Sequence, residues 1–381
     1  MAENSKIEWT NHTWNPWRGC TKVSAGCANC YAETMSGRNP GTLGVWGPNG
    51  TRVVASEAMW KQPLKWNKQA EDDAAWHSAH RSFDPERPRV FCASLADVFE
   101  DWQGPMLDSK GQELAVHRGC GNVAPWDCEW VQGSGNDFRS LTMQDVRTRL
   151  FRLIDDTPNL DWLLLTKRPE NIAKMMPAYF PGGYIAEAGT MNQEGERPNV
   201  WLGTSVENQQ AADERIPHLL SVPAKVRFLS IEPLLGPIDL SGHMNSKRGY
   251  FSGVDSLECC GETYEKRADI DWVIVGGESG HGARPCRVEW IRDIVRQCKA
   301  AGVPVFVKQM GGNVITRNDM IEDAFNNGES GWPDPDVQHN INGFREEYQG
   351  ADCRIKLADK KGGDWSEWPE DLRVRQFPNV H

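Results

Sequence analysis

Short apolar runs recur along the chain, separated by stretches in which apolar residues return every three or four positions. The runs are continuous rather than alternating and rich in Val, Leu, Ile and Phe, which is typical of strands buried on both faces of a parallel sheet. They are Arg89–Ala93, Trp162–Thr166, Val200–Gly203, Val226–Ser230, Trp272–Gly276 and Val303–Val307. Lys6–Thr10 is a further candidate for the first strand.

The stretches between these runs have the period of amphipathic helices. Thr142–Asp155 places its apolar residues on one face, Asn208–Leu220 shows the same pattern, and Val288–Ala301 is followed by Gly302, a residue favoured at helix C-termini. This alternation predicts an α/β fold, a full or partial (β/α) TIM-like barrel with parallel strands and right-handed crossovers. An open Rossmann-like sheet is the alternative, but no GxGxxG follows the first strand.

The barrel is expected to span residues 1–312, followed by a polar C-terminal extension at 313–381. Two segments are predicted to be insertions into the barrel. Residues 101–141 are rich in Gly, Cys and Trp, and residues 240–268 are polar and contain a Cys-Cys pair. Connections of this length usually carry function or additional structure.

Composition narrows the class of protein. With 381 residues, 39% hydrophobic and 25% charged, the chain is globular, which excludes disordered and fibrous classes. No run of 18 apolar residues is present and the N-terminus has no signal-peptide pattern, so we expect a cytoplasmic protein without a membrane partner. The net charge of −11 argues against binding to extended nucleic acid but leaves room for a local basic pocket.

The cysteines carry the strongest chemical signal. Eleven cysteines without a secretory signal do not suggest a disulfide framework. Three of them form C-x6-C-x2-C after the predicted first strand: Cys20, Cys27 and Cys30. Three thiolates this close can hold an iron–sulfur cluster while leaving one iron without a protein ligand, and Gly19 and Gly26 let the loop bend. A zinc site completed by His12 or another cysteine, or cysteines with no shared role, are the alternatives.

Further cysteines fall in the insertions. His117, Cys120 and Cys128 lie in the first, and Cys259 and Cys260 in the second. A zinc or second metal site would form there if the insertions fold together, although the spacing matches no standard ligand pattern. The isolated cysteines read as packed side chains: Cys92, Cys286, Cys298 and Cys353.

Polar residues at the predicted strand ends form a second signal, because such groups line the site of a (β/α) barrel. Ser205 and Glu207 are candidates for hydrogen bonds to a ribose, and Glu232 and Glu278 for binding an ammonium group or accepting a proton. The adjacent glycines Gly276 and Gly277 would allow a ligand close to the backbone. The alternative is a tight Gly-Gly turn, with each Glu stabilised by a helix dipole.

Basic residues also follow the strands. Lys167, Arg168 and Lys308 are candidates for binding an anionic substrate, and Arg284 and Arg287 share that prediction. Other polar residues at strand ends are Ser94, Asp97, Thr166 and Gln309. Lys167, Glu232 and Lys308 are the candidates for a catalytic role, through acid–base or Schiff-base chemistry if the protein were a metal-independent enzyme. Solvated surface charges are the alternative.

Most of the chain resembles a known superfamily. The motifs are NPWRGCTKVSAGCANCYAE, VFCASLADVFED, DWLLLTKRPENI, VWLGTSVENQ, VRFLSIEPLLGPIDL, DWVIVGGESGHGARPC, VPVFVKQMGG and the tail GGDWSEWPEDLRVRQFP. Together they resemble the radical S-adenosylmethionine (SAM) superfamily, and more closely an uncharacterised phage and bacterial family of three-cysteine radical-SAM-like proteins. The spacing here is three residues longer than the superfamily's C-x3-C-x2-C, Asn29 stands where an aromatic residue is common, and the GGE motif comes late in the chain.

The resemblance implies an enzyme with a 4Fe–4S cluster on Cys20, Cys27 and Cys30, whose fourth iron is chelated by SAM. One electron from a donor such as flavodoxin or ferredoxin would cleave SAM, and the resulting 5′-deoxyadenosyl radical would abstract hydrogen from substrate. The phage association suggests a nucleotide or nucleic-acid-derived substrate and a location in a bacterial or phage-infected cell. The alternative is a non-catalytic iron–sulfur or zinc protein organised by the same motif.

Overall fold

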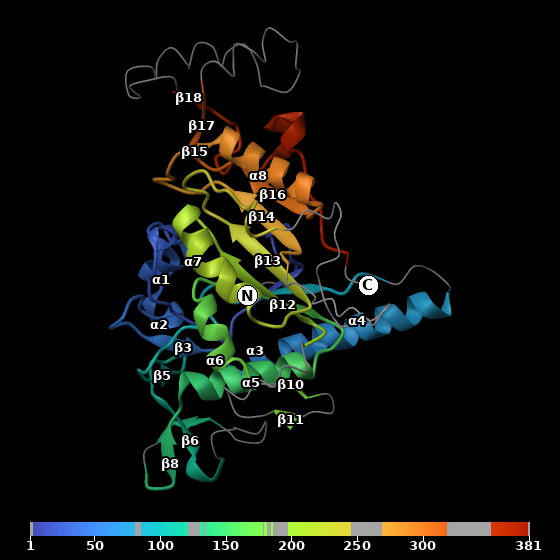
Figure 1. Ribbon diagram of the computed structural model, residues 1–381. Coiled ribbons are helices and arrows are strands. Elements are labelled where there is room, and N and C mark those ends of the chain that lie inside the picture. Colours follow the sequence, from blue (N-terminus) through green and yellow to red (C-terminus); the bar gives the residue numbers. More distant parts are fainter. Residues whose placement is uncertain are drawn as a thin grey trace, which may run out of the picture. The chain divides into compact units, whose positions relative to one another are not determined.

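The computed structural model describes residues 3–80, 85–120, 130–132, 135–177, 179–180, 184–185, 197–244, 269–317 and 352–379. They fall into two compact units. The first comprises Met1–Thr204 with Val222–Lys225, and the second comprises Ser205–Ser221 with Val226–His381. Figure 1 shows the elements of both units.

The main strands of the first unit are parallel and run in the order β1 (His12–Trp14), β4 (Arg89–Cys92), β9 (Asp161–Thr166) and β12 (Val200–Ser205). In β9 and β12 nearly every residue is buried, as their continuous apolar sequences predict.

Lys6–Thr10 is not a strand, and this prediction is wrong. The segment turns locally, because the Ile7 amide donates to Ser5 Oγ at 3.0 Å and the Thr10 amide to the Ile7 carbonyl at 3.1 Å. Pairing with β4 starts only at Asn11, whose amide donates to the Arg89 carbonyl at 2.9 Å. The first strand is therefore β1.

Helices and small sheets complete the first unit. The capping box at Thr142 starts the predicted helix α5 (Met143–Asp155), with Asp145 as the reciprocal partner. The other helices are α1 (Tyr31–Arg38), α2 (Pro40–Leu43), α3 (Glu57–Trp60), α4 (Gln62–Ala79) and α6 (Ile172–Met175), with short 3₁₀ turns η1 (Ala25–Cys27), η2 (Arg118–Cys120) and η3 (Pro169–Asn171). The small sheets are formed by β2 (Trp17–Arg18), β3 (Arg52–Val54) and β5 (Met106–Leu107), by β6 (Leu114–His117), β7 (Val131–Gln132) and β8 (Phe138–Ser140), and by β10 (Tyr179–Phe180) and β11 (Tyr184–Ile185).

The second unit carries three parallel strands among its described residues, in the order β13 (Val226–Ile231), β14 (Trp272–Gly276) and β16 (Val305–Gln309). β16 begins two residues later than predicted, because Pro304 has no N–H for the ladder. Its helices are α7 (Gln209–Leu220), capped by Asn208, and α8 (Val288–Ala301), which ends at Gly302 with φ +70°. A small sheet of β15 (Cys286–Arg287), β17 (Val314–Arg317) and β18 (Asp352–Ile355) and the turns η4 (Trp365–Glu367) and η5 (Glu370–Leu372) follow.

The chain thus has an α/β fold with parallel strands, as predicted, and each of the six apolar runs overlaps a strand. The segment 101–141 holds β5 to β8, largely as an antiparallel sheet. Of the segment 240–268, residues 245–268 lie outside the described residues. No helix in the described ranges is long and apolar enough to cross a membrane.

Candidate functional site

The three cysteines of the N-terminal motif lie on one loop of the first unit. Cys20 follows β2, Cys27 ends η1, and Cys30 directly precedes α1. None of the three forms a disulfide bond. Gly19 makes the bend into this cysteine loop with φ +109°, and a Cβ there would lie 2.3 Å from the Thr51 carbonyl oxygen. Its role as a bending glycine, predicted from the sequence, is confirmed.

Thr21, the residue after Cys20, is fixed by three charged side chains. Its amide donates to Glu100 Oε1 at 2.9 Å, its carbonyl accepts from Arg168 Nη2 at 2.7 Å, and its hydroxyl accepts from Arg52 Nη2 at 2.9 Å. All three charged residues are buried. The loop is therefore held at its first cysteine by bonds to both backbone and side chain.

The charges that hold Thr21 are themselves paired. Arg52 donates twice to Glu100, at 2.8 Å from Nε and 2.7 Å from Nη2, and Arg168 Nη1 lies 2.8 Å from Asp97 Oδ2. Asp97 also accepts from Thr166 Oγ1 at 2.7 Å. Because Asp97 and Glu100 follow β4 and Thr166 ends β9, the network anchors the cysteine loop at the carboxyl ends of two neighbouring strands. That edge is where ligands bind in parallel α/β folds.

The start of α1 is anchored to the same segment. Tyr31, next to Cys30, donates from its hydroxyl to the Ser94 carbonyl at 2.6 Å. Asn15 Nδ2 donates to Ser94 Oγ at 3.1 Å and its Oδ1 accepts from the Leu95 amide at 2.7 Å. The loop is thus tied to one backbone segment before Cys20 and after Cys30.

Cys20 lies in a strongly charged environment. Burial raises the pKa of its thiol to about 12, with Asp97 and Glu100 adding to the shift and Arg168 opposing it. Arg168 Nη1 lies 3.8 Å from Cys20 Sγ. Without a bound metal Cys20 is therefore a neutral thiol at pH 7, and metal binding there would release its proton.

The thiols of the cysteine loop are ligands that either an iron–sulfur cluster or a zinc ion could use. Across the part of the chain that the structure describes, no three His, Cys, Asp or Glu side chains converge as ligands of one metal ion must. His12, the fourth zinc ligand considered from the sequence, has its ring stacked on Trp66 at 4.2 Å between centroids. In a 4Fe–4S cluster each cysteine binds a different iron, so three free thiols on one anchored loop need not meet at a point.

The second predicted metal site falls largely outside the described residues. Cys128, Cys259 and Cys260 lie there, while the backbone at Cys120 ends η2 and His117 ends β6. A site formed by these residues stays a prediction.

In the second unit, the structure brings Glu232 and Lys308 together. Lys308 Nζ lies 2.8 Å from Glu232 Oε1, with the two side chains 26% and 12% exposed. β14 lies between β13 and β16 and ends at Gly276, where a Cβ would lie 3.2 Å from Glu232 Oε1. The missing side chain at Gly276 thus leaves room for the ion pair to form across the end of β14.

Ser205 and Glu207, the candidates for ribose binding, are both buried beside α7. Arg215 of this helix donates from Nη1 to Glu207 Oε2 and to the Ser205 carbonyl, each at 2.8 Å. The Glu207 side chain is 2% exposed. Its carboxylate is therefore neutralised within the second unit.

Glu278 and Gly277 also have close neighbours in their own unit. Arg284 donates to the Glu278 carboxylate from Nη2 at 2.6 Å and from Nε at 3.0 Å. A Cβ at Gly277 would lie 2.2 Å from the Met310 carbonyl oxygen, so this glycine is required by the packing of the chain itself. Arg287 directly precedes α8, with its guanidinium 5.8 Å from the Trp290 ring.

The remaining basic candidates separate into the two units. In the first, the Lys167 amide donates to Asp97 Oδ2 at 3.1 Å and its side chain is half-buried beside the buried Arg168. In the second, Gln309, next to Lys308, donates from Nε2 to the Gly277 carbonyl at 2.8 Å. The catalytic and cofactor-binding roles assigned to these residues remain predictions.

Sequence reasoning missed Arg52, Glu100, Asn15 and Tyr31 as supports of the cysteine loop. Arg52 and Glu100 each stand beside apolar residues, in TRVVA and DVFED. A charged residue inside an apolar run could have indicated such a support, because a charge that is buried with its apolar neighbours requires a partner.

The chain matches a family of known proteins over most of its length. The family model described as "Protein of unknown function (DUF5131)" matches residues 4–105 and 131–354. The chain belongs to this DUF5131 family. No curated protein and no solved structure matches it. Both the cysteine loop and the Glu232–Lys308 pair lie inside the DUF5131 match, whereas residues 106–130, within the predicted first insertion, lie outside it.

Proposed function

We propose that the protein is a radical SAM-type enzyme, in which Cys20, Cys27 and Cys30 hold a 4Fe–4S cluster at one end of a partial (β/α) barrel. One observation carries this proposal: the cysteines are free thiols on a loop whose first cysteine is followed by a residue fixed by three buried charges. A rigid support is what a cluster site needs, since each ligand must be held in position.

Three cysteine ligands would leave one iron of such a cluster available to the amino and carboxylate groups of SAM. When bound, the cluster would supply the electron that cleaves SAM reductively. Arg168 would donate an N–H to the sulfur of Cys20, since its Nη1 already lies 3.8 Å from that atom. Hydrogen bonds to the sulfurs and burial are the means by which a protein tunes cluster potential.

A radical SAM-type reaction also requires an electron donor and a substrate. The electron would come from a donor such as flavodoxin or ferredoxin, and the substrate would be a nucleotide or nucleic-acid-derived molecule. The Glu232–Lys308 pair is our candidate for contacting substrate, because both charges lie at strand ends and are partly exposed. Lys167 is the corresponding candidate in the first unit.

The test is anaerobic purification and cluster reconstitution, followed by iron and sulfide counting and EPR spectroscopy of the reduced protein with and without SAM. We expect about four irons per chain and an EPR signal altered by SAM. Cys27→Ala should lose the iron, whereas Cys298→Ala, which removes a buried thiol of α8, should retain it.

Two results would contradict the proposal. Stoichiometric zinc with no iron uptake would assign the loop to a structural metal. Four irons with a SAM-independent signal and no 5′-deoxyadenosine would make the protein a non-catalytic iron–sulfur protein.

A further inference from the structure

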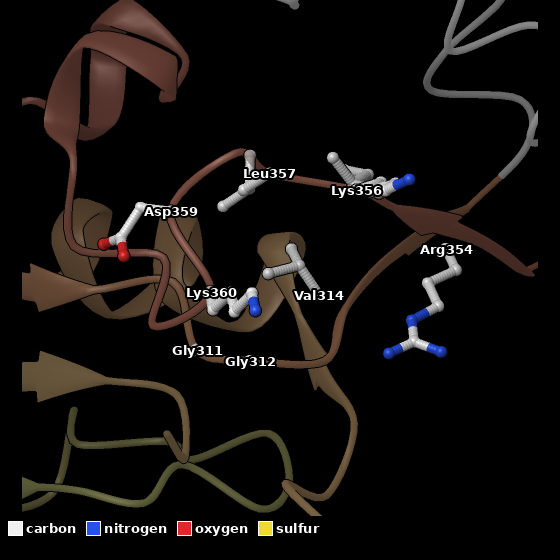
Figure 2. A pocket seen from close by; sticks show the side chains of 9 residues that line it. Gly311, Gly312, Val314, Arg354, Lys356, Leu357, Asp359 and Lys360 are labelled. Atoms are coloured by element: carbon white, nitrogen blue, oxygen red, sulfur yellow. The ribbon is translucent and has the colours of Figure 1, made fainter. Parts of the chain in front are cut away.

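A cavity of about 340 Å³ lies in the second unit, between the Gly311–Gly312 backbone, β17, β18 and the segment that follows β18. Figure 2 shows Val314, Leu357 and Lys360 gathered around this space. Its volume lies within the range of pockets that bind small molecules.

The walls of the cavity are fixed by the chain's own hydrogen bonds. The Asp359 carboxylate accepts from the backbone amides of Gly363 at 2.6 Å and of Lys361 and Asp364, each at 3.2 Å. The Gly362 carbonyl accepts from the Met310 amide at 2.8 Å. The loop after β18 is therefore tied to the end of β16, and the cavity is preformed.

The lining combines positive charge with an apolar floor. Arg354, Lys356 and Lys360 contribute three cations, although the whole chain has a net charge of −11. Val314 and Ile355 are 3% and 4% exposed and form the apolar part.

Among the described residues that line the cavity, the one carboxylate, Asp359, does not cancel these cations. Asp359 is already bonded to backbone amides, which lower its pKa, and its carboxylate points away from Val314 in Figure 2. The cavity therefore favours an anion that also has an apolar body.

We propose that this cavity binds an organic phosphate of nucleotide size. Its phosphate would lie at Lys360, with Lys356 adding positive charge at the edge of the cavity, since ammonium groups bind phosphate as point charges. Its apolar body would contact Val314, Ile355 and Leu357. The proposal is independent of the cluster, because every residue involved belongs to the second unit.

The test is calorimetric titration of the full chain with AMP, adenosine and inorganic phosphate, repeated on the Cys27→Ala protein so that cluster loss is separated from this site. We expect AMP to bind at one site per chain, and adenosine and phosphate each at least about tenfold more weakly, because each lacks one half of the recognised chemistry. AMP binding should be the same in Cys27→Ala.

Two charge-reversal variants locate the site. Lys356→Glu with Lys360→Glu should weaken AMP binding at least about tenfold, the scale of a lost charged contact. Lys299→Glu with Lys65→Glu changes the net charge equally at two exposed lysines that do not line the cavity, and should leave the affinity unchanged. Equal losses in both variants, adenosine binding as tightly as AMP, or no AMP binding at millimolar concentration would each overturn the proposal.

Discussion

Arg52→Met tests whether the buried charges position the cysteine loop. Arg52 donates twice to Glu100, once to Thr21 and once to the Thr51 carbonyl, and its guanidinium lies 4.0 Å from the Trp102 ring centre. Its side chain is 0% exposed and that of Glu100 is 3% exposed. The substitution removes the closer cation of the buried Glu100 and leaves Arg168 Nη2, which lies 3.6 Å from Glu100 Oε1, so we expect a cost of about 3 kcal/mol, the lower end of the range for breaking a buried ion pair.

The assay is amide hydrogen exchange read by mass spectrometry. We expect peptides covering residues 15–21 and 94–100 to exchange about 100-fold faster or more in Arg52→Met, since every 1.4 kcal/mol of opening free energy changes the rate about tenfold. Peptides from α8, in the second unit, are the internal control and should exchange as in the wild type.

A second substitution separates the charge effect from lost packing. Adding Glu100→Gln to Arg52→Met removes the buried charge that has lost its closer cation but keeps an oxygen that can accept from the Thr21 amide, so the double variant should exchange more slowly than the single one. The positioning role would be refuted if residues 15–21 of Arg52→Met exchanged at a rate within threefold of that of the wild type. It would also be refuted if the effects of Arg52→Met and Glu100→Gln on exchange were purely additive.

Three further predictions concern stability. Burial raises the pKa of Asp161 from 3.8 to about 6, so ionisation of this carboxyl lowers the stability of the folded state progressively between these pH values and by the full amount above pH 6. Asp161→Asn should therefore raise stability by up to about 3 kcal/mol at pH 8 and by much less at pH 4, and an equal gain in thermal unfolding at both pH values would contradict this. Gly277→Ala places a Cβ 2.2 Å from the Met310 carbonyl oxygen and should lower the free energy of unfolding in urea by at least about 1–3 kcal/mol. Gly37→Ala, whose Cβ would have nothing within 4 Å, should be neutral or stabilising, and similar effects of the two substitutions would refute the packing argument. Thr142→Ala removes the capping box of α5 and should lower the free energy of unfolding by about 1 kcal/mol, while Thr142→Ser keeps the hydroxyl and should retain most of the stability. An equal loss of stability in both variants, measured by thermal unfolding, would exclude capping as the cause.

The buried strands and amphipathic helices could be predicted because each signal is local. β14 and α8 match their predicted bounds, since a continuous apolar run and a helical period are written in consecutive residues. β1 could not be found in this way, because it has only three residues and its position depends on pairing with β4, far along the chain.

The same limit applies to the candidate site. Cys20, Cys27 and Cys30 stand out through their spacing, and Glu232 and Lys308 through their places after apolar runs. The partners of these residues are long-range: Arg168 and Cys20 are 148 positions apart, and Arg52 and Glu100 are 48 apart. Sequence patterns identify such residues one at a time, and only the fold shows which of them meet.

Arg168 shows why the buried charges around Thr21 are better explained by positioning of the cysteine loop than by a gain in stability. Buried ion pairs are often no more stabilising than apolar side chains of the same volume, because removing charges from water is expensive. Here one guanidinium contacts the Asp97 carboxylate, the Thr21 carbonyl and the sulfur of Cys20, so the segment after β4 and the first two residues of the cysteine loop are held around one rigid planar group. An apolar side chain could fill the same space but could not fix the backbone at Thr21 or donate to a sulfur. Arg168→Met should therefore impair iron retention in the reconstituted protein more than Arg149→Met, which removes another buried arginine of the first unit, one that is paired with Glu57 of α3. Equal iron content in the two variants would show that the arginine serves the fold rather than the site.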